Sequence, residues 1–300
     1  MKVEQNMLKF SAAGGLFFAI LGIGWGLAIS SDMIMFDGVY SLISLFLAMV
    51  AIFMANYIEK KDDGKFPFGK GMLEPITVAF KSIVLIVMCS MTLLNAIKEL
   101  FNGGNQIDTN SALGYSLVSS IGCAIVFIIM NKKGKKLSSD ILKAESNQWL
   151  MDTVLSVAVL IGFIISIIMD KTSLAYLTKY VDPFMVVMSA SLFLRVPIVT
   201  LIDSFKEIVN GNANEEINEQ IGSIVKDIEN EYNFEDSYTR VSKIGRELRI
   251  EIDFIFNDES KLDDLKDIDK VREKVYNNMS GLNFKKWLNI NFTGDKKWAI

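Results

Sequence analysis

Six long apolar runs dominate the first two thirds of this chain. They cover about residues 11–30, 32–57, 75–100, 113–131, 144–168 and 183–202. A helix needs roughly 20 apolar residues to cross the ~30 Å hydrocarbon core of a bilayer, so the runs predict six transmembrane helices in membrane lipid. Ser138, Ser139 and Asp140 are typical N-cap residues, which lets the fifth helix begin before its apolar run.

Beyond about residue 205 the composition becomes that of an acidic soluble domain. Its apolar residues recur first at helical spacing, then in alternation, then at helical spacing, then in alternation again. The first helical set is Ile217, Ile221, Ile224 and Ile228, and the second is Leu262, Leu265, Ile268, Val271 and Val275. Two strands lie between them, Val241-Ser242-Lys243-Ile244 and, after a turn at Gly245, Leu248, Ile250, Ile252 and Phe254; the final strand has Leu288, Ile290 and Phe292. This αββαβ order predicts an α+β, ferredoxin-like domain over 206–300, with two helices covering a small antiparallel sheet. Residues 1–205 form the predicted transmembrane domain.

The lysines between the runs predict the orientation in the membrane. Eleven lie in the first ten residues and in the second–third and fourth–fifth loops, against two, Lys171 and Lys179, on the other side. Basic loops stay in the cytoplasm, so we expect a multi-pass cell-membrane protein with both termini cytoplasmic. The chain carries no long basic tract, and we expect no nucleic-acid partner.

The chain contains no histidine. Histidine is the commonest nitrogen ligand of zinc, so any metal site must use oxygen atoms or the two cysteines. Cys89 and Cys123 lie far apart in separate apolar runs. We expect both to be packing residues.

Two of the apolar runs carry polar residues on one helical face. The second has Asp37, Tyr40 and Ser44, and the fifth has Glu145, Gln148 and Asp152, both at positions i, i+3 and i+7. Tyr40 and Asp152 lie about 13 Å and 12 Å from opposite membrane surfaces at 1.5 Å per residue. The two faces can therefore meet near the midplane, where transporters hold their cargo. Hydrogen bonding between helices is the alternative role for these residues.

The order and spacing of several motifs resemble those of the cation diffusion facilitator family over nearly the whole chain. They are FDGVYSLIS (Phe36–Ser44), FPFGKGMLEP (Phe66–Pro75), AESNQWLMDTVLS (Ala144–Ser156), Asp182-Pro183 and TRVSKIGRELRIEIDFIF (Thr239–Phe256). The resemblance implies export of a metal cation from the cytoplasm in exchange for protons, by alternating access. It also implies a homodimer with cytoplasmic tails that pair. We expect these tails to be regulatory, and we expect no prosthetic group.

Carried over by position, the family's central metal site falls on Tyr40, Ser44, Gln148 and Asp152. Family members usually have His or Asp at the first two positions and His and Asp at the last two, so only Asp152 keeps the expected type. Other family positions also differ. The loop histidines become Phe66 and Lys70, the tail ligands become Asp253, Asn289 and Asn291, and a Lys/Arg–Asp pair becomes Met72 and Asn210.

Oxygen-only sites suit hard cations, so we expect Mn²⁺ or Fe²⁺ to be favoured over Zn²⁺. Asp152 is the expected anionic ligand and proton carrier. Asp37 and Glu145 are expected to line the outward and inward access routes, or to supply further ligands. Two alternatives stay open: a non-transporting relative that serves as a subunit or sensor, and a transporter of a monovalent cation. For the tail residues we favour solvated or interfacial polar side chains over a metal site, and for Asp62-Asp63 we favour a solvated charged loop over a cation site.

Overall fold

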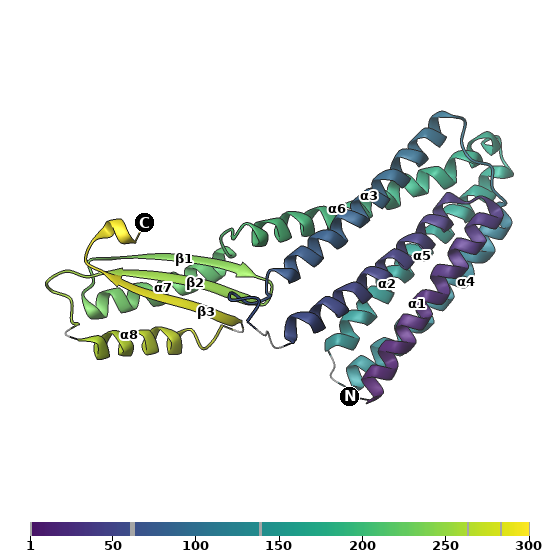
Figure 1. Ribbon diagram of the computed structural model, residues 1–300. Helices are drawn as coiled ribbons and strands as arrows, with labels where there is room; N and C mark the ends of the chain where they lie inside the picture. Colours follow the sequence, from purple (N-terminus) through teal and green to yellow (C-terminus); the bar gives the residue numbers. More distant parts are fainter. Residues whose placement is uncertain (1, 61–63, 138–139, 263, 283, 300) are drawn as a thin grey trace. The chain divides into compact units, whose positions relative to one another are not determined.

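Six long helices form the first part of the computed structural model, which describes residues 2–60, 64–137, 140–262, 264–282 and 284–299 (Figure 1). The helices are α1 (Lys2–Ile29), α2 (Asp32–Glu59), α3 (Leu73–Phe101), α4 (Thr109–Leu137), α5 (Asp140–Asp170) and α6 (Val181–Ile208), with the 3-10 helix η1 (Ala175–Tyr180) before α6. Each of the six is long and apolar enough to cross a membrane, so the predicted transmembrane helices are confirmed. α5 begins at Asp140, before its apolar run as predicted, whereas Ser138, Ser139, Asp62 and Asp63 lie outside the described residues.

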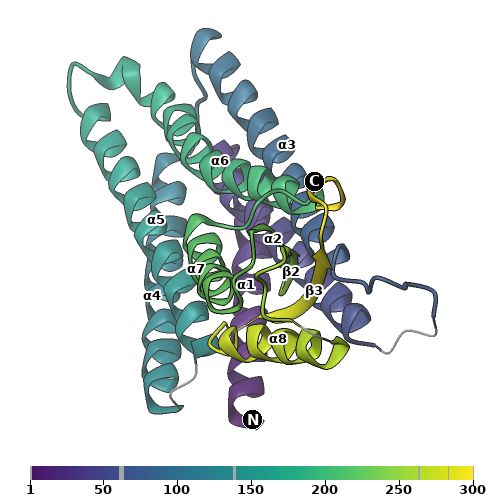
Figure 2. The same ribbon diagram turned by 90° about the vertical axis from the view of Figure 1, so that its left-hand side faces the viewer.

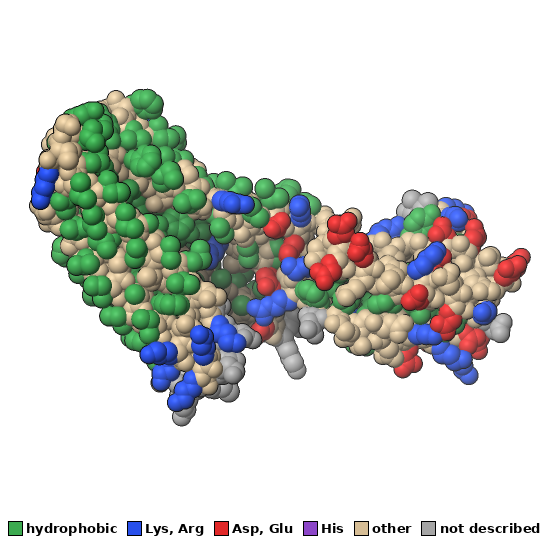
Figure 3. All heavy atoms as spheres, turned by 180° about the vertical axis from the view of Figure 1, so that it is seen from behind, with side chains coloured by type: hydrophobic (Ala, Val, Ile, Leu, Met, Phe, Trp, Pro, Cys, Tyr) green, Lys and Arg blue, Asp and Glu red, His purple; other side chains and the backbone are tan. Residues whose placement is uncertain are grey.

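Large apolar side chains cover the outside of these helices. Phe17, Phe46 and Leu192 are 58%, 58% and 68% exposed. Figure 3 shows hydrophobic atoms over much of the visible surface of the helical part. A soluble protein rarely leaves so much apolar surface in water, whereas a lipid-facing helix keeps such side chains outward. The chain is therefore a multi-pass membrane protein.

The structure divides into two compact units, and the first contains residues 1–52 and 81–199. In this unit α1 and α2 cross closely at glycines. A Cβ atom on Gly38 would lie 2.6 Å from the backbone nitrogen of Ile23, and one on Gly26 would lie 2.6 Å from that of Met35. Small residues allow such close approach of membrane helices. Since Gly38 follows Asp37, this crossing fixes the position of Asp37.

A dry cluster beyond Asp37 joins α2 to α3, α5 and α6. Met33 and Phe36 of α2 pack with Cys89 of α3, Phe163 of α5 and Val186 of α6, and all five are at most 3% exposed. Cys123 is also buried, in a second cluster with Trp149. Both cysteines are free and buried, in agreement with the predicted packing role.

The second unit contains residues 53–80 and 200–300. Its elements after α6 are α7 (Glu215–Tyr232), β1 (Asp236–Ile244), β2 (Glu247–Ile255), α8 (Leu265–Asn278), β3 (Lys285–Thr293) and η2 (Lys296–Trp298). The αββαβ order is as predicted, and α7 and α8 pack on one face of the sheet (Figures 1 and 2).

The prediction of an antiparallel sheet was wrong for one of its two pairings. β1 and β2 are antiparallel around Gly245, whose φ is +56°, but β2 and β3 are parallel, with Ile250 opposite Leu288. The reason is that α8 connects β2 to β3 and returns the chain to the end of the sheet at which β2 begins, so that β3 runs in the same direction as β2.

The predicted stripe of the second tail helix is also corrected at its start. Asp264 caps the helix, because its side chain accepts hydrogen bonds from the backbone of Lys266 and Asp267. Leu262 therefore lies before α8, and Leu265 is 76% exposed. Only the later members of the stripe, such as Val271 and Val275, are fully buried.

Candidate functional site

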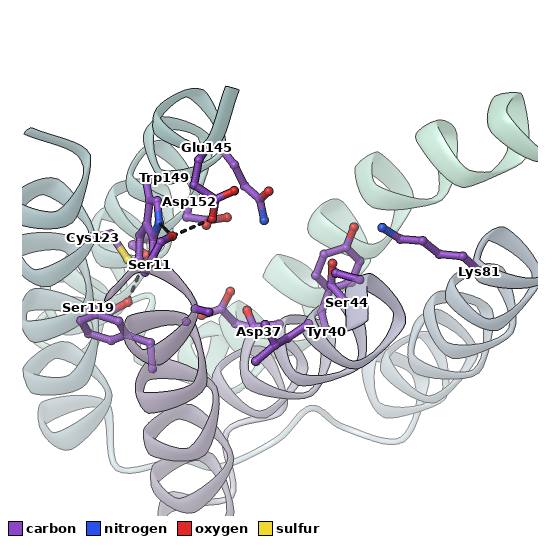
Figure 4. Close-up of a pocket in the computed structure, with 18 residues that line it drawn as sticks. Ser11, Asp37, Tyr40, Ser44, Lys81, Ser119, Cys123, Glu145, Trp149 and Asp152 are labelled. Carbon is purple, nitrogen blue, oxygen red and sulfur yellow. Dashed lines mark hydrogen bonds between the residues drawn. The ribbon is translucent and has the colours of Figure 1, made fainter. Parts of the chain in front are cut away.

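A cavity of about 200 Å³ lies among α1, α2, α3, α4 and α5 of the first unit (Figure 4). All six residues predicted from the sequence line it: Asp37, Tyr40, Ser44, Glu145, Gln148 and Asp152. The two polar helix faces therefore border one space, and none of the six is turned away to the lipid. Ser11, Lys81, Ser119, Cys123, Trp149 and Ser156 are among the other lining residues.

The cavity extends from the middle of the helices toward the end at which α1, α3 and α5 begin. Its lining includes Ser11, Lys81 and Glu145 from the first halves of these three helices. Toward the opposite end lies the dry cluster that contains Met33 and Phe163. The cavity is thus closed on the side of this cluster.

Asp37 stands between the cavity and a small void on the side of the dry cluster. The void, of about 10 Å³, is lined by Asp37 and by Tyr115, Ser119 and Ser156. The Tyr115 hydroxyl is buried and has no hydrogen-bond partner among the described residues. Ser119 and Ser156 hydrogen bond to each other at 3.1 Å and join α4 to α5. The polar lining therefore continues past Asp37 before it meets apolar side chains.

Glu145 is held in place by a short chain of hydrogen bonds. Trp149 Nε1 donates to Ser11 Oγ at 2.6 Å, and Ser11 Oγ donates to Glu145 Oε1 at 2.6 Å. Ser11 and Trp149 are 2% and 5% exposed. The sequence analysis missed both residues, although the i, i+4 spacing of Glu145 and Trp149 places them on one face.

Tyr40 is positioned by its ring. The ring stacks on that of Phe193 of α6, with centroids 4.5 Å apart and an angle of 24° between the planes. Such an offset stack orients the hydroxyl without using it. The Tyr40 oxygen therefore stays available to the cavity.

Most of the side chains predicted as metal ligands have no hydrogen-bond or ion-pair partner among the described residues. In the described part of the chain, the side chains of Asp37, Tyr40, Ser44, Gln148 and Asp152 make no hydrogen bond or ion pair. A polar side chain within a transmembrane segment is costly unless something satisfies it. Free carboxylate, hydroxyl and amide oxygens are the ligands that hard cations use.

The acidic residues share the cavity but do not form a compact cluster. Among the described residues, no group of three His, Cys, Asp or Glu side chains lies close enough to hold a metal ion together. Neutral oxygens and water must therefore complete the shell of any cation bound here, unless the helices move closer. Hard divalent cations commonly keep several waters.

Two other family positions have structural partners. Asp182 accepts hydrogen bonds from Ser31 Oγ at 2.6 Å and from the Asp32 backbone at 2.9 Å, so it holds the start of α2. In the tail, Asp253 is 3% exposed rather than solvated. Arg240 and Asn291 donate to its two oxygens at 2.7 Å and 2.8 Å. These carboxylates are occupied by protein donors, in contrast to Asp37 and Asp152.

Comparison with known proteins connects this geometry to transport. The manganese efflux system protein MneP of Bacillus subtilis is 25% identical over 213 residues, which cover 71% of this chain and 69% of that protein. An uncharacterised transporter of Methanocaldococcus jannaschii is 24% identical over 173 residues, which cover 55% of this chain and 58% of that protein. Residues 8–209 match the family of the cation efflux transmembrane domain, a range that includes most of α1, all of α2 to α6 and the whole cavity. The chain thus belongs to the cation diffusion facilitator family of metal cation transporters.

Proposed function

We propose that this chain exports a hard divalent cation, Mn²⁺ or Fe²⁺ in preference to Zn²⁺, and that Asp152 is the principal anionic ligand. The observation that carries this proposal is the Asp152 carboxylate, which lines the cavity without a protein partner. Tyr40, Ser44 and Gln148 add neutral oxygens to the same cavity. Oxygen ligands without imidazole disfavour Zn²⁺ relative to harder ions. The name of the similar B. subtilis protein, a manganese efflux system, supports the same class of cargo.

Charge supports a divalent rather than a monovalent cargo. Asp37, Glu145 and Asp152 are the three acidic residues of the lining and Lys81 is its basic residue, a formal charge of −2 when all are ionised. One divalent cation neutralises this charge, whereas one monovalent cation does not. Free oxygens in the cavity also favour transport over a non-transporting role as subunit or sensor.

Alternating access accounts for the positions of the other two carboxylates. Asp37 borders the void on the side of the dry cluster, and Glu145 lies near the end at which α5 begins. In our proposal, Glu145 lines the inward route, Asp37 lines the outward route, and helix rocking opens one side at a time. Asp152 takes up a proton from the outside when the metal leaves and releases it to the cytoplasm when the next metal ion binds. This exchange couples metal export to proton entry.

The basic loops support an orientation with both termini in the cytoplasm. The end of the helices where α1, α3 and α5 begin carries most of the loop lysines, and the cavity extends toward it. We further propose a homodimer whose tails, over 206–300, pair and regulate transport in the cytoplasm. The face of the tail sheet opposite α7 and α8 supports such pairing, because it leaves Trp287 36% exposed.

Metal flux into proteoliposomes tests the proposal. The purified full-length protein should move Mn²⁺ and Fe²⁺ faster than Zn²⁺ and Na⁺, with proton movement in the opposite direction. Asp152→Asn should reduce the flux by about a hundredfold, because a carboxylate at the centre of the site interacts with the cation in both access states. Asp37→Asn should have a smaller effect, and Gln148→Ala a smaller effect again.

Asp170→Asn is the matched control, since Asp170 is an exposed acidic residue at the end of the same helix, α5. It should leave the flux unchanged. Equal flux for the wild type and Asp152→Asn, or no flux of any cation, would contradict the proposal.

A further inference from the structure

Lys81 introduces a positive charge into a cavity that otherwise favours cations. It lies eight residues after the start of α3 at Leu73, about 12 Å along the helix axis. Its side chain is half-buried, lines the cavity and extends from α3 toward Tyr40 and Ser44 (Figure 4). The family resemblance assigns no role to this position.

The Lys81 ammonium is not neutralised by a direct contact. Among the described residues, it makes no hydrogen bond or ion pair. A lysine within a transmembrane helix costs several kcal/mol unless water or an opposite charge compensates it. The acidic residues that could do so, Glu145 and Asp152, project from α5 on the other side of the cavity (Figure 4).

We propose that Lys81 is a fixed counter-charge that sets the cation affinity of the cavity. It reduces the charge of the cavity from −3 to −2, so that one divalent cation balances the site and can still be released. This inference rests on the proposed function for its cargo. Its new element is that Lys81 determines the charge of the cation that the cavity binds and the affinity of that binding.

Electrostatics predicts the sign of the effect. Lys81 repels a bound cation across the cavity, and this repulsion is greater for a trivalent than for a divalent ion. Removing the charge should therefore tighten binding and slow release. A lysine that merely extends its ammonium toward water along the helix would change neither quantity.

Terbium binding tests the charge of the cavity independently of the physiological cargo. Tb³⁺ is a hard, oxygen-seeking trivalent ion whose luminescence is sensitised by a nearby indole, and Trp149 lines the cavity. The signal that Asp152→Asn removes reports binding in the cavity. Lys81→Gln and Lys81→Met should tighten this binding at least about tenfold, which corresponds to about 1.4 kcal/mol, because each removes a positive charge that repels the trivalent ion. Lys81→Arg should bind as the wild type does.

Lys98→Gln is the matched control, since it removes an exposed lysine near the other end of the same helix. It should leave Tb³⁺ affinity unchanged. In proteoliposomes, Lys81→Gln should bind Mn²⁺ more tightly but turn over at least about fivefold more slowly, because release becomes limiting.

The outcomes separate the two proposals. Tighter Tb³⁺ binding in Lys81→Gln without Mn²⁺ flux in the wild type would support the counter-charge and reject the proposed transport. Equal Tb³⁺ affinity in Lys81→Gln and the wild type would overturn the counter-charge, whatever the flux. Absence of any signal sensitive to Asp152 would overturn both.

Discussion

Ser11 of α1 donates a 2.6 Å hydrogen bond to the carboxylate of Glu145 of α5, and the same hydroxyl accepts the Trp149 N–H. One serine thus ties two helices together at the edge of the cavity. It satisfies a buried indole and orients a carboxylate, while the other oxygen of Glu145 makes no hydrogen bond among the described residues.

Replacement of this serine should destabilise the first unit. Ser11→Ala leaves the buried Trp149 N–H without its acceptor, which costs about 1–3 kcal/mol. We expect a lower unfolding temperature in detergent, measured by tryptophan fluorescence. Ser41→Ala is the control, because Ser41 lines the same cavity and makes no hydrogen bond in the described part of the chain. Equal loss of stability in both variants would contradict the role of Ser11.

Where α1 and α2 cross, alanine should be tolerated at Gly24 of α1 but not at Gly38 of α2. A Cβ on Gly38 meets backbone atoms at 2.6 Å and 2.8 Å, so Gly38→Ala must push the helices apart, at a cost of about 1–3 kcal/mol. The shift also moves Asp37 and should reduce metal flux. Gly24→Ala is the control, since nothing lies within 4 Å of its added Cβ.

The loss of stability is measured by size-exclusion chromatography after heating, and the loss of transport is measured as metal flux in proteoliposomes. Gly24→Ala should match the wild type in both measurements. If Gly38→Ala also matches it, the close crossing of α1 and α2 is not needed for the site.

The ion pair between the half-exposed Arg240 and the buried Asp253 should matter more than the exposed ion pairs of the tail. Asp253 is almost fully buried beside Arg240, so Arg240→Ala leaves a carboxylate with only Asn291 to satisfy it, at a cost of about 3–5 kcal/mol. We expect faster amide hydrogen exchange in β1 and β2 of the full-length protein. Arg246→Ala should have almost no effect on this exchange, because its side chain is 75% exposed and its ion pairs with Glu59 and Glu74 are long, at 3.9 Å and 3.5 Å.

The start of α4 should loosen in acid. Asp108 accepts hydrogen bonds from the Ser111 hydroxyl, at 2.6 Å, and from the backbone of Asn110 and Ser111. The Ser111 side-chain hydrogen bond is the main cause that holds the pKa of Asp108 below its ordinary value. A carboxyl whose pKa is lower in the folded state stabilises that state above its unfolded pKa and loses this contribution as pH falls through the folded pKa.

Hydrogen exchange at Thr109–Ser111 should therefore accelerate as the pH falls through the acidic range of a carboxyl, after correction for the intrinsic rate. Asp108→Ala should show fast exchange at neutral pH already, with no further acid-dependent step. An acid step that persists in Asp108→Ala would assign the titration to another group.

Local sequence patterns were sufficient to predict the six helices, the order of the tail elements and the two polar faces. Their apolar lengths and their periods of 3.6 and 2 are properties of single segments. This is why Asp37, Tyr40 and Ser44 could be placed on one face of α2, and Gln148 and Asp152 on one face of α5. Neither inference needs to know how the helices pack.

The tertiary structure decided which other residues reach the cavity and how the strands pair. Ser11 and Lys81 line it because of the rotation and crossing of α1 and α3, and a lysine near the start of a membrane helix looks the same in sequence when it merely faces water. β3 pairs in parallel with β2 because of the path of α8, a contact between segments more than 30 residues apart. Single-segment periodicity contains no information about such distant contacts, since packing between segments sets them.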